Sequence, residues 1–129
     1  MATWNLEQTK HHVFICNGSS CTKAGAEELT SAVRAEITAR DLDPFIHTTR
    51  TLCAGRCQDR CVIVSYPDAH WYHEMDASLA GAFIDSLSDG MQLTDSISHR
   101  HNGQTFEREQ GTPAGIDKNP DIVKRVSKL

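Results

Sequence analysis

The chain has 129 residues, of which 39% are hydrophobic and 23% are charged, and its formal net charge is −4. This length supports one ordinary hydrophobic core, and the negative charge argues against nucleic acid as the main partner. No stretch approaches the ~20 apolar residues of a membrane-spanning helix, and the first residues lack a basic, then apolar, signal pattern. We therefore expect a cytoplasmic protein that does not contact membranes.

The first half of the chain predicts a strand, a helix and a second strand. An apolar run predicts a buried strand over residues 11–16. Apolar residues then recur every three or four positions and predict a helix from about residue 22 to residue 40. A stretch rich in β-branched and aromatic residues predicts the second strand over 45–50. Such a β-α-β unit is typical of two parallel strands joined by a crossover helix.

The next elements predict an antiparallel pair and a closing helix. Residues 62–66 form the strongest strand pattern, Pro67-Asp68 predicts a turn, and residues 70–73 predict the returning strand. Asp76 predicts the N-cap of a helix through about residue 88, with Gly90 as its stop. The order of elements predicts an α/β fold of the thioredoxin-like sandwich type, with a central mixed sheet of about four strands flanked by helices.

The last forty residues differ in character from the rest. Asn102-Gly103 predicts a hairpin turn, although the flanking residues are polar. Asn119 and Pro120 predict the start of a short helix that ends near residue 127. We expect residues 1–90 to form the domain and residues 91–129 to form a C-terminal extension, a hairpin and a short helix, packed on it.

Five cysteines fall into two groups, at positions 16 and 21 and at positions 53, 57 and 61. In a reducing compartment such thiols suggest metal ligation or redox chemistry rather than disulfides. Each group lies in a loop that follows a predicted strand, and both loops are expected at one end of the sheet. Four thiols in two pairs suit a [2Fe–2S] cluster, and the candidate ligands are Cys16, Cys21, Cys53 and Cys57.

Basic residues follow the cysteines and could offset the negative charge of such a cluster: Lys23, Arg50, Arg56 and Arg60. Backbone N–H groups in the glycine-containing loops could donate hydrogen bonds to its sulfur atoms. An exposed cluster would give the protein a partner surface that includes Arg56, Gln58 and Arg60.

The segments 13–29, 51–57 and 62–72 together resemble the thioredoxin-like [2Fe–2S] ferredoxins and the small [2Fe–2S] subunit of respiratory complex I. The resemblance covers residues 12–89 and implies the same four cysteine ligands. It also implies a cytoplasmic homodimer that carries single electrons between a reductase and an acceptor enzyme, and that is not itself an enzyme. Relatives commonly have Gly-Pro before the third strand, where this chain has Arg60-Cys61.

Several alternatives remain open at this point. A structural zinc-binding interaction module would also use paired cysteines, although these spacings are not diagnostic of zinc. A redox or metal sensor, or a cluster-delivery protein, would give a role to Cys61, which could instead be a small buried side chain. Three histidine pairs could form a second metal site or lie in solvent: His11/His12, His70/His73 and His99/His101. Trp71 and Tyr72 could form a contact surface or pack within their hairpin.

Overall fold

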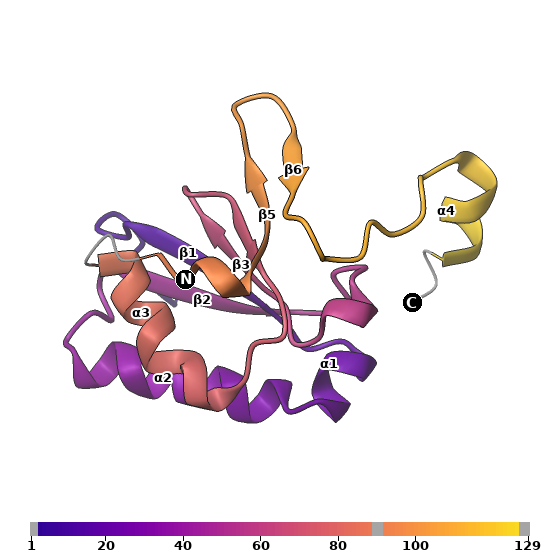
Figure 1. The fold of residues 1–129 in the computed structure, drawn as a ribbon. Helices are drawn as coiled ribbons and strands as arrows, with labels where there is room; N and C mark the ends of the chain where they lie inside the picture. The colour runs from indigo at the N-terminus through magenta and orange to yellow at the C-terminus, as the bar shows by residue number, and fades with distance from the viewer. Residues whose placement is uncertain (1–2, 89–91, 127–129) are drawn as a thin grey trace.

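A computed structural model describes residues 3–88 and 92–126. Its centre is a six-stranded sheet in the order β2-β1-β3-β4-β5-β6 (Figure 1). The strands are β1 (His11–Cys16), β2 (Ile46–Thr51), β3 (Ile63–Tyr66), β4 (His70–Tyr72), β5 (Ile97–His101) and β6 (Phe106–Arg108). The pair β1–β2 is parallel and the other pairs are antiparallel. The predicted α/β class with a mixed sheet is confirmed.

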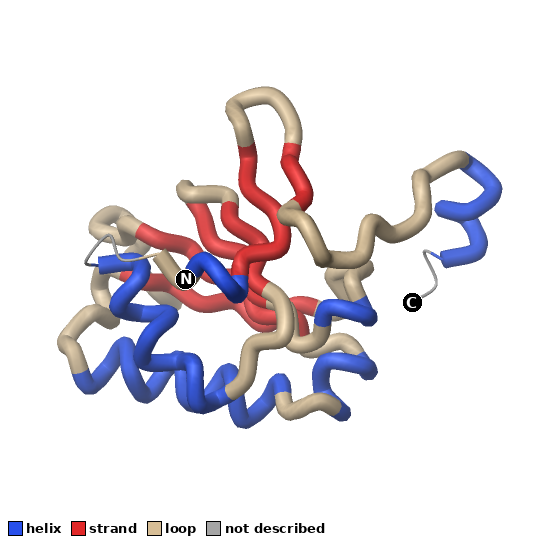
Figure 2. Tube along the Cα trace, in the orientation of Figure 1, coloured by secondary structure: helices blue, strands red, loops and turns tan. Residues whose placement is uncertain are grey.

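The helices are α1 (Ser19–Lys23), α2 (Ala26–Ala39), α3 (Ala80–Ser88) and α4 (Pro120–Val126), with short 3-10 turns η1 (Cys57–Asp59), η2 (Ala77–Leu79) and η3 (Thr94–Ser96). Helices α2 and α3 lie side by side on one face of the sheet (Figure 2). None of the helices in the described parts of the chain is long and apolar enough to cross a membrane.

The predicted first helix is in fact two helices. The chain turns at Gly25, whose φ of +102° is a left-handed backbone conformation that favours glycine. This turn separates α1, which carries Cys21, from the long α2. The apolar spacing of α2 is as predicted, and its buried side chains include Leu29, Val33 and Ile37. Sequence periodicity therefore located the long helix but not the short turn of helix in front of it.

The sheet has two strands more than predicted. The Asn102-Gly103 turn joins β5 and β6, and Asn102 Oδ1 accepts hydrogen bonds from the amides of Gln104 and Thr105. This hairpin continues the central sheet, because β5 pairs with β4 through Trp71–His99 and Tyr72–Ile97. Its polar residues therefore need no core of their own.

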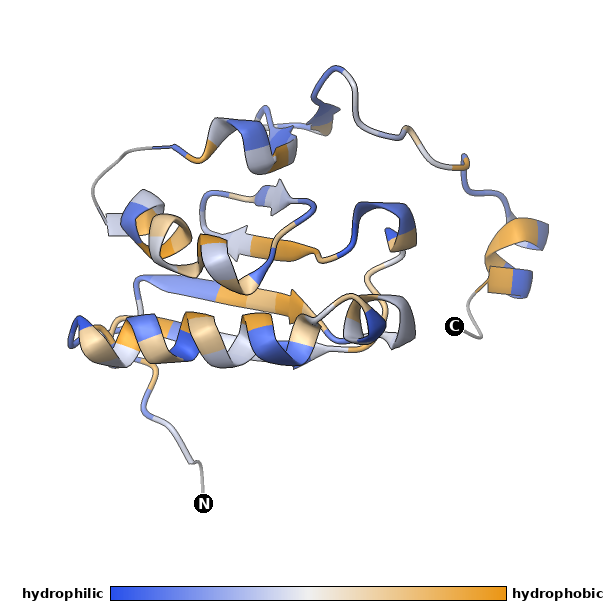
Figure 3. Ribbon diagram, turned by 60° about the horizontal axis from the view of Figure 1, so that its bottom comes forward, coloured by the Kyte–Doolittle hydropathy of each residue, from blue (hydrophilic) through white to orange (hydrophobic). Residues whose placement is uncertain are grey.

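The core lies between the sheet and the two long helices. Val13 and Ile15 of β1 and Ile63 of β3 are fully buried in it, and parts of the central strands are hydrophobic (Figure 3). Asp76 caps the closing helical segment as predicted, with its Oδ1 2.9 Å from the amide of Ser78. The predicted stop at Gly90 lies outside the described residues. Helix α4 begins at Pro120 beyond the sheet, and its Asn119 cap accepts a 2.9 Å hydrogen bond from the Ile122 amide.

Phe83 of α3 tests the packing of this core. It is fully buried, and its ring meets that of Tyr72 edge-on with centroids 5.0 Å apart. Because truncation leaves a cavity between helix and sheet, we expect Phe83→Ala to lower the free energy of unfolding by about 3–5 kcal/mol. Urea denaturation measures this loss. Val123→Ala, on exposed α4, is the control and should change stability by less than about 0.5 kcal/mol; equal losses in the two variants would contradict the prediction.

Candidate functional site

The two cysteine groups meet where β1 and β2 end. These strands are parallel and in register, with Cys16 opposite Thr51, so their loops leave from the same edge of the sheet. The Asn17 amide donates to the Thr51 carbonyl at 2.9 Å and continues the pairing one residue past the strands. The sequence-based expectation that both loops emerge together therefore matches the observed topology.

The backbones of the two loops are in direct contact. A Cβ built on Gly18 would lie 2.8 Å from Cys53 Cα, a separation that packed atoms do not tolerate. The Cys16 thiol lies 3.5 Å from the Leu52 carbonyl oxygen. A glycine after the first cysteine is what allows the second loop to lie against it, so residue 18 fixes the distance between the two groups.

The four predicted ligands form two adjacent pairs. In the second loop, the Sγ atoms of Cys53 and Cys57 are 3.6 Å apart. In the first, both thiols are buried, and Cys16 contributes to the raised pKa of Cys21 and of Cys53. Across residues 3–88 and 92–126, no three His, Cys, Asp or Glu side chains are grouped to hold one metal ion.

The environment keeps at least two of these thiols protonated. Burial, followed by hydrogen bonding to the Cys16 thiol, raises the pKa of Cys21 to about 12. At Cys53 the Gly55 amide, 3.2 Å from Sγ, lowers the pKa, but burial and the Cys57 thiol outweigh it and the pKa rises. Only thiolates bind metals, so a metal must displace protons here, and its binding will weaken as the pH falls.

The four predicted cations lie in different settings. Lys23 is exposed, and Arg50 makes a long 3.8 Å ion pair with Glu27. Arg60 is exposed and lies 3.5 Å from the Cys57 carbonyl. Arg56, in contrast, has a side chain only 17% exposed that pairs with buried Asp59, Nε to Oδ2 2.7 Å. Arg56 is therefore paired and largely covered, whereas Gln58 and Arg60, the other two residues expected on a partner surface, are exposed.

Sequence reasoning gave no role to Asp59 or to the residues around Pro113. Asp59 is 2% exposed, and the carbonyls of Pro113 and Ala114 both accept hydrogen bonds from the Arg56 guanidinium. The spacing of Arg56 and Asp59, one turn apart, was a usable signal for their ion pair. Nothing in the sequence indicated that a segment almost sixty residues later returns to this loop.

Cys61 is buried at the start of the strand that follows the second loop. Its thiol lies 3.5 Å from the Cys21 carbonyl and 3.6 Å from that of Ala24, and burial raises its pKa. It sits under α1 and satisfies carbonyl groups at the end of that helix.

Six of the seven histidines are partly buried, and His101 is exposed. His12, His70 and His99 are partly buried, and burial lowers the pKa of each. His12 Nε2 is 2.7 Å from Thr49 Oγ1, and its ring is 5.0 Å from that of His47. Trp71 meets His99 and Phe106 edge-on, which is packing within the extended sheet.

Two named relatives are similar to this chain in sequence. A protein of Priestia megaterium named "Putative 2Fe-2S ferredoxin" is 40% identical over 121 residues, covering 92% of this chain and 94% of the relative. The chain belongs to the [2Fe–2S] ferredoxin family. A second ferredoxin relative, "Ferredoxin, 2Fe-2S" from Clostridium pasteurianum, is 27% identical over 78% of the chain and 95% of its own length. No protein-family profile matches.

Solved structures agree on the fold of this ferredoxin. The thioredoxin-like [2Fe-2S] ferredoxin of Aquifex aeolicus superposes with a TM-score of 0.66 at 22% identity, covering 75% of this chain and 96% of the other. An NAD+-reducing [NiFe]-hydrogenase also contains the fold, with a TM-score of 0.50 at 13% identity over 67% of this chain and 16% of that one. The predicted family, thioredoxin-like fold, [2Fe–2S] cofactor and single-electron carrier class are confirmed.

Gly18 offers a test of the contact between the loops of the ferredoxin. Gly18→Ala would push a methyl group into the Cys53 backbone, and we expect a loss of roughly 1–3 kcal/mol in unfolding free energy, with less iron bound per folded chain. Gly81→Ala in α3 is the matched control, because its new Cβ would lie 3.5 Å from the flexible Arg40 side chain.

Chemical denaturation measures the unfolding free energy of the two variants, and iron analysis measures the iron bound per folded chain. The helical control should be neutral or gain roughly 0.5–1 kcal/mol. Iron content equal to wild type in Gly18→Ala would mean that the two loops do not need their present separation.

Proposed function

We propose that Cys16, Cys21, Cys53 and Cys57 hold the [2Fe–2S] cluster of this ferredoxin, which carries single electrons between a reductase and an acceptor enzyme without catalysing a reaction itself. The observation that carries this proposal is the meeting of both cysteine pairs at the shared end of β1 and β2. When bound, the cluster supplies the one-electron redox chemistry; the protein supplies ligands, charge and partial burial.

The spacing of the thiols fits two half-sites. Two thiolates on one tetrahedral metal at about 2.3 Å are about 3.8 Å apart, and Cys53 and Cys57 are already 3.6 Å apart. In the first pair, both thiols are buried, and hydrogen bonding to Cys16 contributes to the raised pKa of Cys21. Little backbone movement is therefore needed for Cys53 and Cys57 to present two thiolates to one iron.

The two pairs differ in their access to solvent. Cys16 and Cys21 are buried, whereas Cys53 and Cys57 are half-buried in a loop at the surface. We therefore assign electron exchange to the side of the second loop, where exposed Arg60 and the neighbouring Gln58 are available to a partner. The extra thiol, Cys61, is engaged beneath α1, which supports a packing role over sensing or cluster delivery.

The surroundings of this site support further parts of the proposal. All five cysteines are free, which suits a reducing compartment such as the cytoplasm.

The family resemblance implies a homodimer, and a suitable surface exists on the sheet face opposite α2 and α3. A groove of about 260 Å3 there includes Phe14, Leu52, Tyr66 and Trp71. The predicted boundary at residue 90 divides the observed sheet, because β5 and β6 lie after it and pair onto β4.

Substitution of single cysteines tests the ligand set. Anaerobically purified protein should be red-brown, with about two irons and two sulfides per chain and an EPR signal on reduction. Cys→Ser at each of the four ligands should remove or alter this cluster, because a ligand is lost. Cys61→Ser is the matched control and should keep the wild-type spectrum.

Two other outcomes would support a different function. A colourless protein with one zinc per chain would replace the electron-carrier proposal by a zinc module. A cluster that disappears in Cys61→Ser would add this thiol to the ligand set and favour the sensor or delivery role.

Light scattering coupled to size-exclusion chromatography tests the dimer. Leu52 is 81% exposed beside the groove, so Leu52→Asp should leave the fold intact while placing an unpaired charge in the interface. We expect it to weaken dimerisation by at least tenfold. Ile116→Asp, at a 76% exposed site in the extension, should leave the dimer as it is; equal effects would argue against this face.

A further inference from the structure

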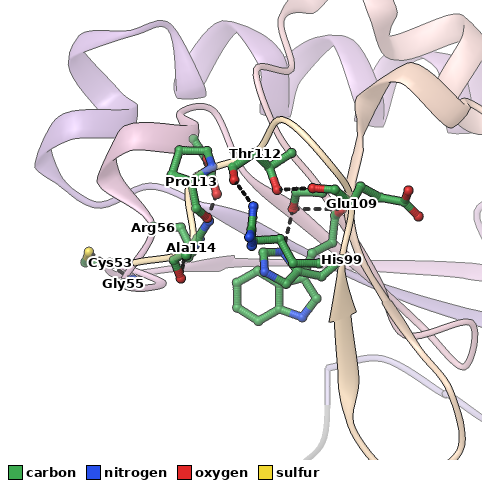
Figure 4. A network of polar contacts seen from close by, with 12 residues as sticks. Cys53, Gly55, Arg56, His99, Glu109, Thr112, Pro113 and Ala114 are labelled. Carbon is green, nitrogen blue, oxygen red and sulfur yellow. Dashed lines mark hydrogen bonds and ion pairs between the residues drawn. The ribbon is translucent and has the colours of Figure 1, made fainter. Parts of the chain in front are cut away.

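The side chain of Arg56 joins two parts of the chain that are far apart in sequence. Arg56 lies between the proposed ligands Cys53 and Cys57, and its guanidinium points to the extension that follows β6 (Figure 4). Its Nη2 donates to the Pro113 carbonyl at 2.5 Å and its Nη1 to that of Ala114 at 3.3 Å. Its Nε donates to Asp59 Oδ2 at 2.7 Å. One side chain thus holds three acceptors in two segments.

The segment that supplies these carbonyls, residues 109–115, is called here the return segment. It is fastened to the sheet at its other end. The Glu109 amide donates to the Ser98 carbonyl at 2.7 Å, and Thr112 Oγ1 donates to the Glu109 carbonyl at 2.8 Å. Arg108 Nη1 donates to the Thr112 carbonyl at 2.5 Å. The return segment is therefore attached to β5 and β6 by hydrogen bonds.

The fit around the guanidinium is close. A Cβ built on Gly115 would lie 2.8 Å from Arg56 Nη1, and the residue has a φ of +85°, so both contact and conformation favour glycine here. Thr112 is buried although it is polar. These features indicate a fixed contact between the second cysteine loop and the return segment.

The charge of Arg56 is balanced within this contact. Asp59 is 2% exposed, and within the described residues its Oδ1 has no hydrogen-bond partner, so Arg56 is its counter-charge. A buried carboxylate left without its partner is strongly unfavourable. Arg56 can serve all three acceptors because its donors form a rigid planar fork, which the single ammonium group of lysine does not provide.

We propose that Arg56 is a positioning residue that fastens the return segment to the second cysteine loop, so that the C-terminal extension forms a wall of the cluster site. The proposal rests on the proposed function, since it takes Cys53 and Cys57 as ligands. Arg56 acts through the position of this loop. It therefore governs how firmly the cluster is retained and, together with the Asp59 charge, the potential at which it is reduced.

Four arginine variants separate geometry from charge. Arg56→Gln removes both the charge and the fork, and Arg56→Lys keeps the charge but not the fork. Arg60→Gln is the matched control, because it removes a positive charge near the same cysteine without touching the return segment. Arg108→Gln loosens the return segment from its far end, and it covers the case in which Arg56→Gln fails to fold.

Hydrogen–deuterium exchange of residues 106–118 in protein without a cluster gives the first readout. We expect several-fold faster exchange in Arg56→Gln, Arg56→Lys and Arg108→Gln, and wild-type exchange in Arg60→Gln. Wild-type exchange in Arg56→Lys would show that charge alone suffices, and would overturn the proposal.

The loaded protein gives the second readout. Cluster loss to a chelator should be several-fold faster in both Arg56 variants and in Arg108→Gln than in Arg60→Gln. The reduction potential should fall most in Arg56→Gln, which leaves Asp59 uncompensated, and less in Arg56→Lys. Equal rates of cluster loss in Arg56→Gln and Arg60→Gln would refute the positioning role of Arg56. A wild-type protein that binds no iron–sulfur cluster would instead refute the proposed function and leave the hydrogen–deuterium exchange result unaffected.

Discussion

The parallel pairing of β1 with β2 is the constraint on which the rest of the site depends. Because Cys16 is opposite Thr51, the two loops that carry the cysteines begin within one strand spacing of each other. A shift in register would move the second loop along the edge and separate the pairs. The crossover through α2 maintains this pairing, since the helix packs its buried side chains against the strands it connects.

The contact at Gly18 turns this topology into a site of defined size. Strands alone bring loops into the same region, but a side chain at position 18 would hold the Cys53 backbone away. The separation of the cysteine pairs is thus set by backbone atoms, which are less mobile than side chains. The pKa values of Cys21 and Cys53 are raised, so a metal bound at the proposed site would have to displace their protons.

Much of the fold could be predicted from local patterns. The apolar run of β1, the helical spacing in α2 and the Asp76 cap are each determined by neighbours in sequence. The break at Gly25 was missed although it is local, and the joining of β5 to β4 was not predicted because the paired strands are far apart in sequence. The candidate ligands could be recognised from cysteine spacing. The contacts of Arg56 could not, because its two carbonyl partners lie 57 and 58 positions later in the sequence.

The acceptors of the Arg56 fork in the return segment are main-chain carbonyls, and this has an evolutionary consequence. A carbonyl group is present whatever side chain its residue carries, so the amino acids at positions 113 and 114 are free to drift. What selection has to preserve is the number of residues between Arg108 and Gly115, together with the arginine and the aspartate in the loop. Among homologues, insertions and deletions there should be rarer than substitutions, and loss of the arginine should accompany changes in tail length.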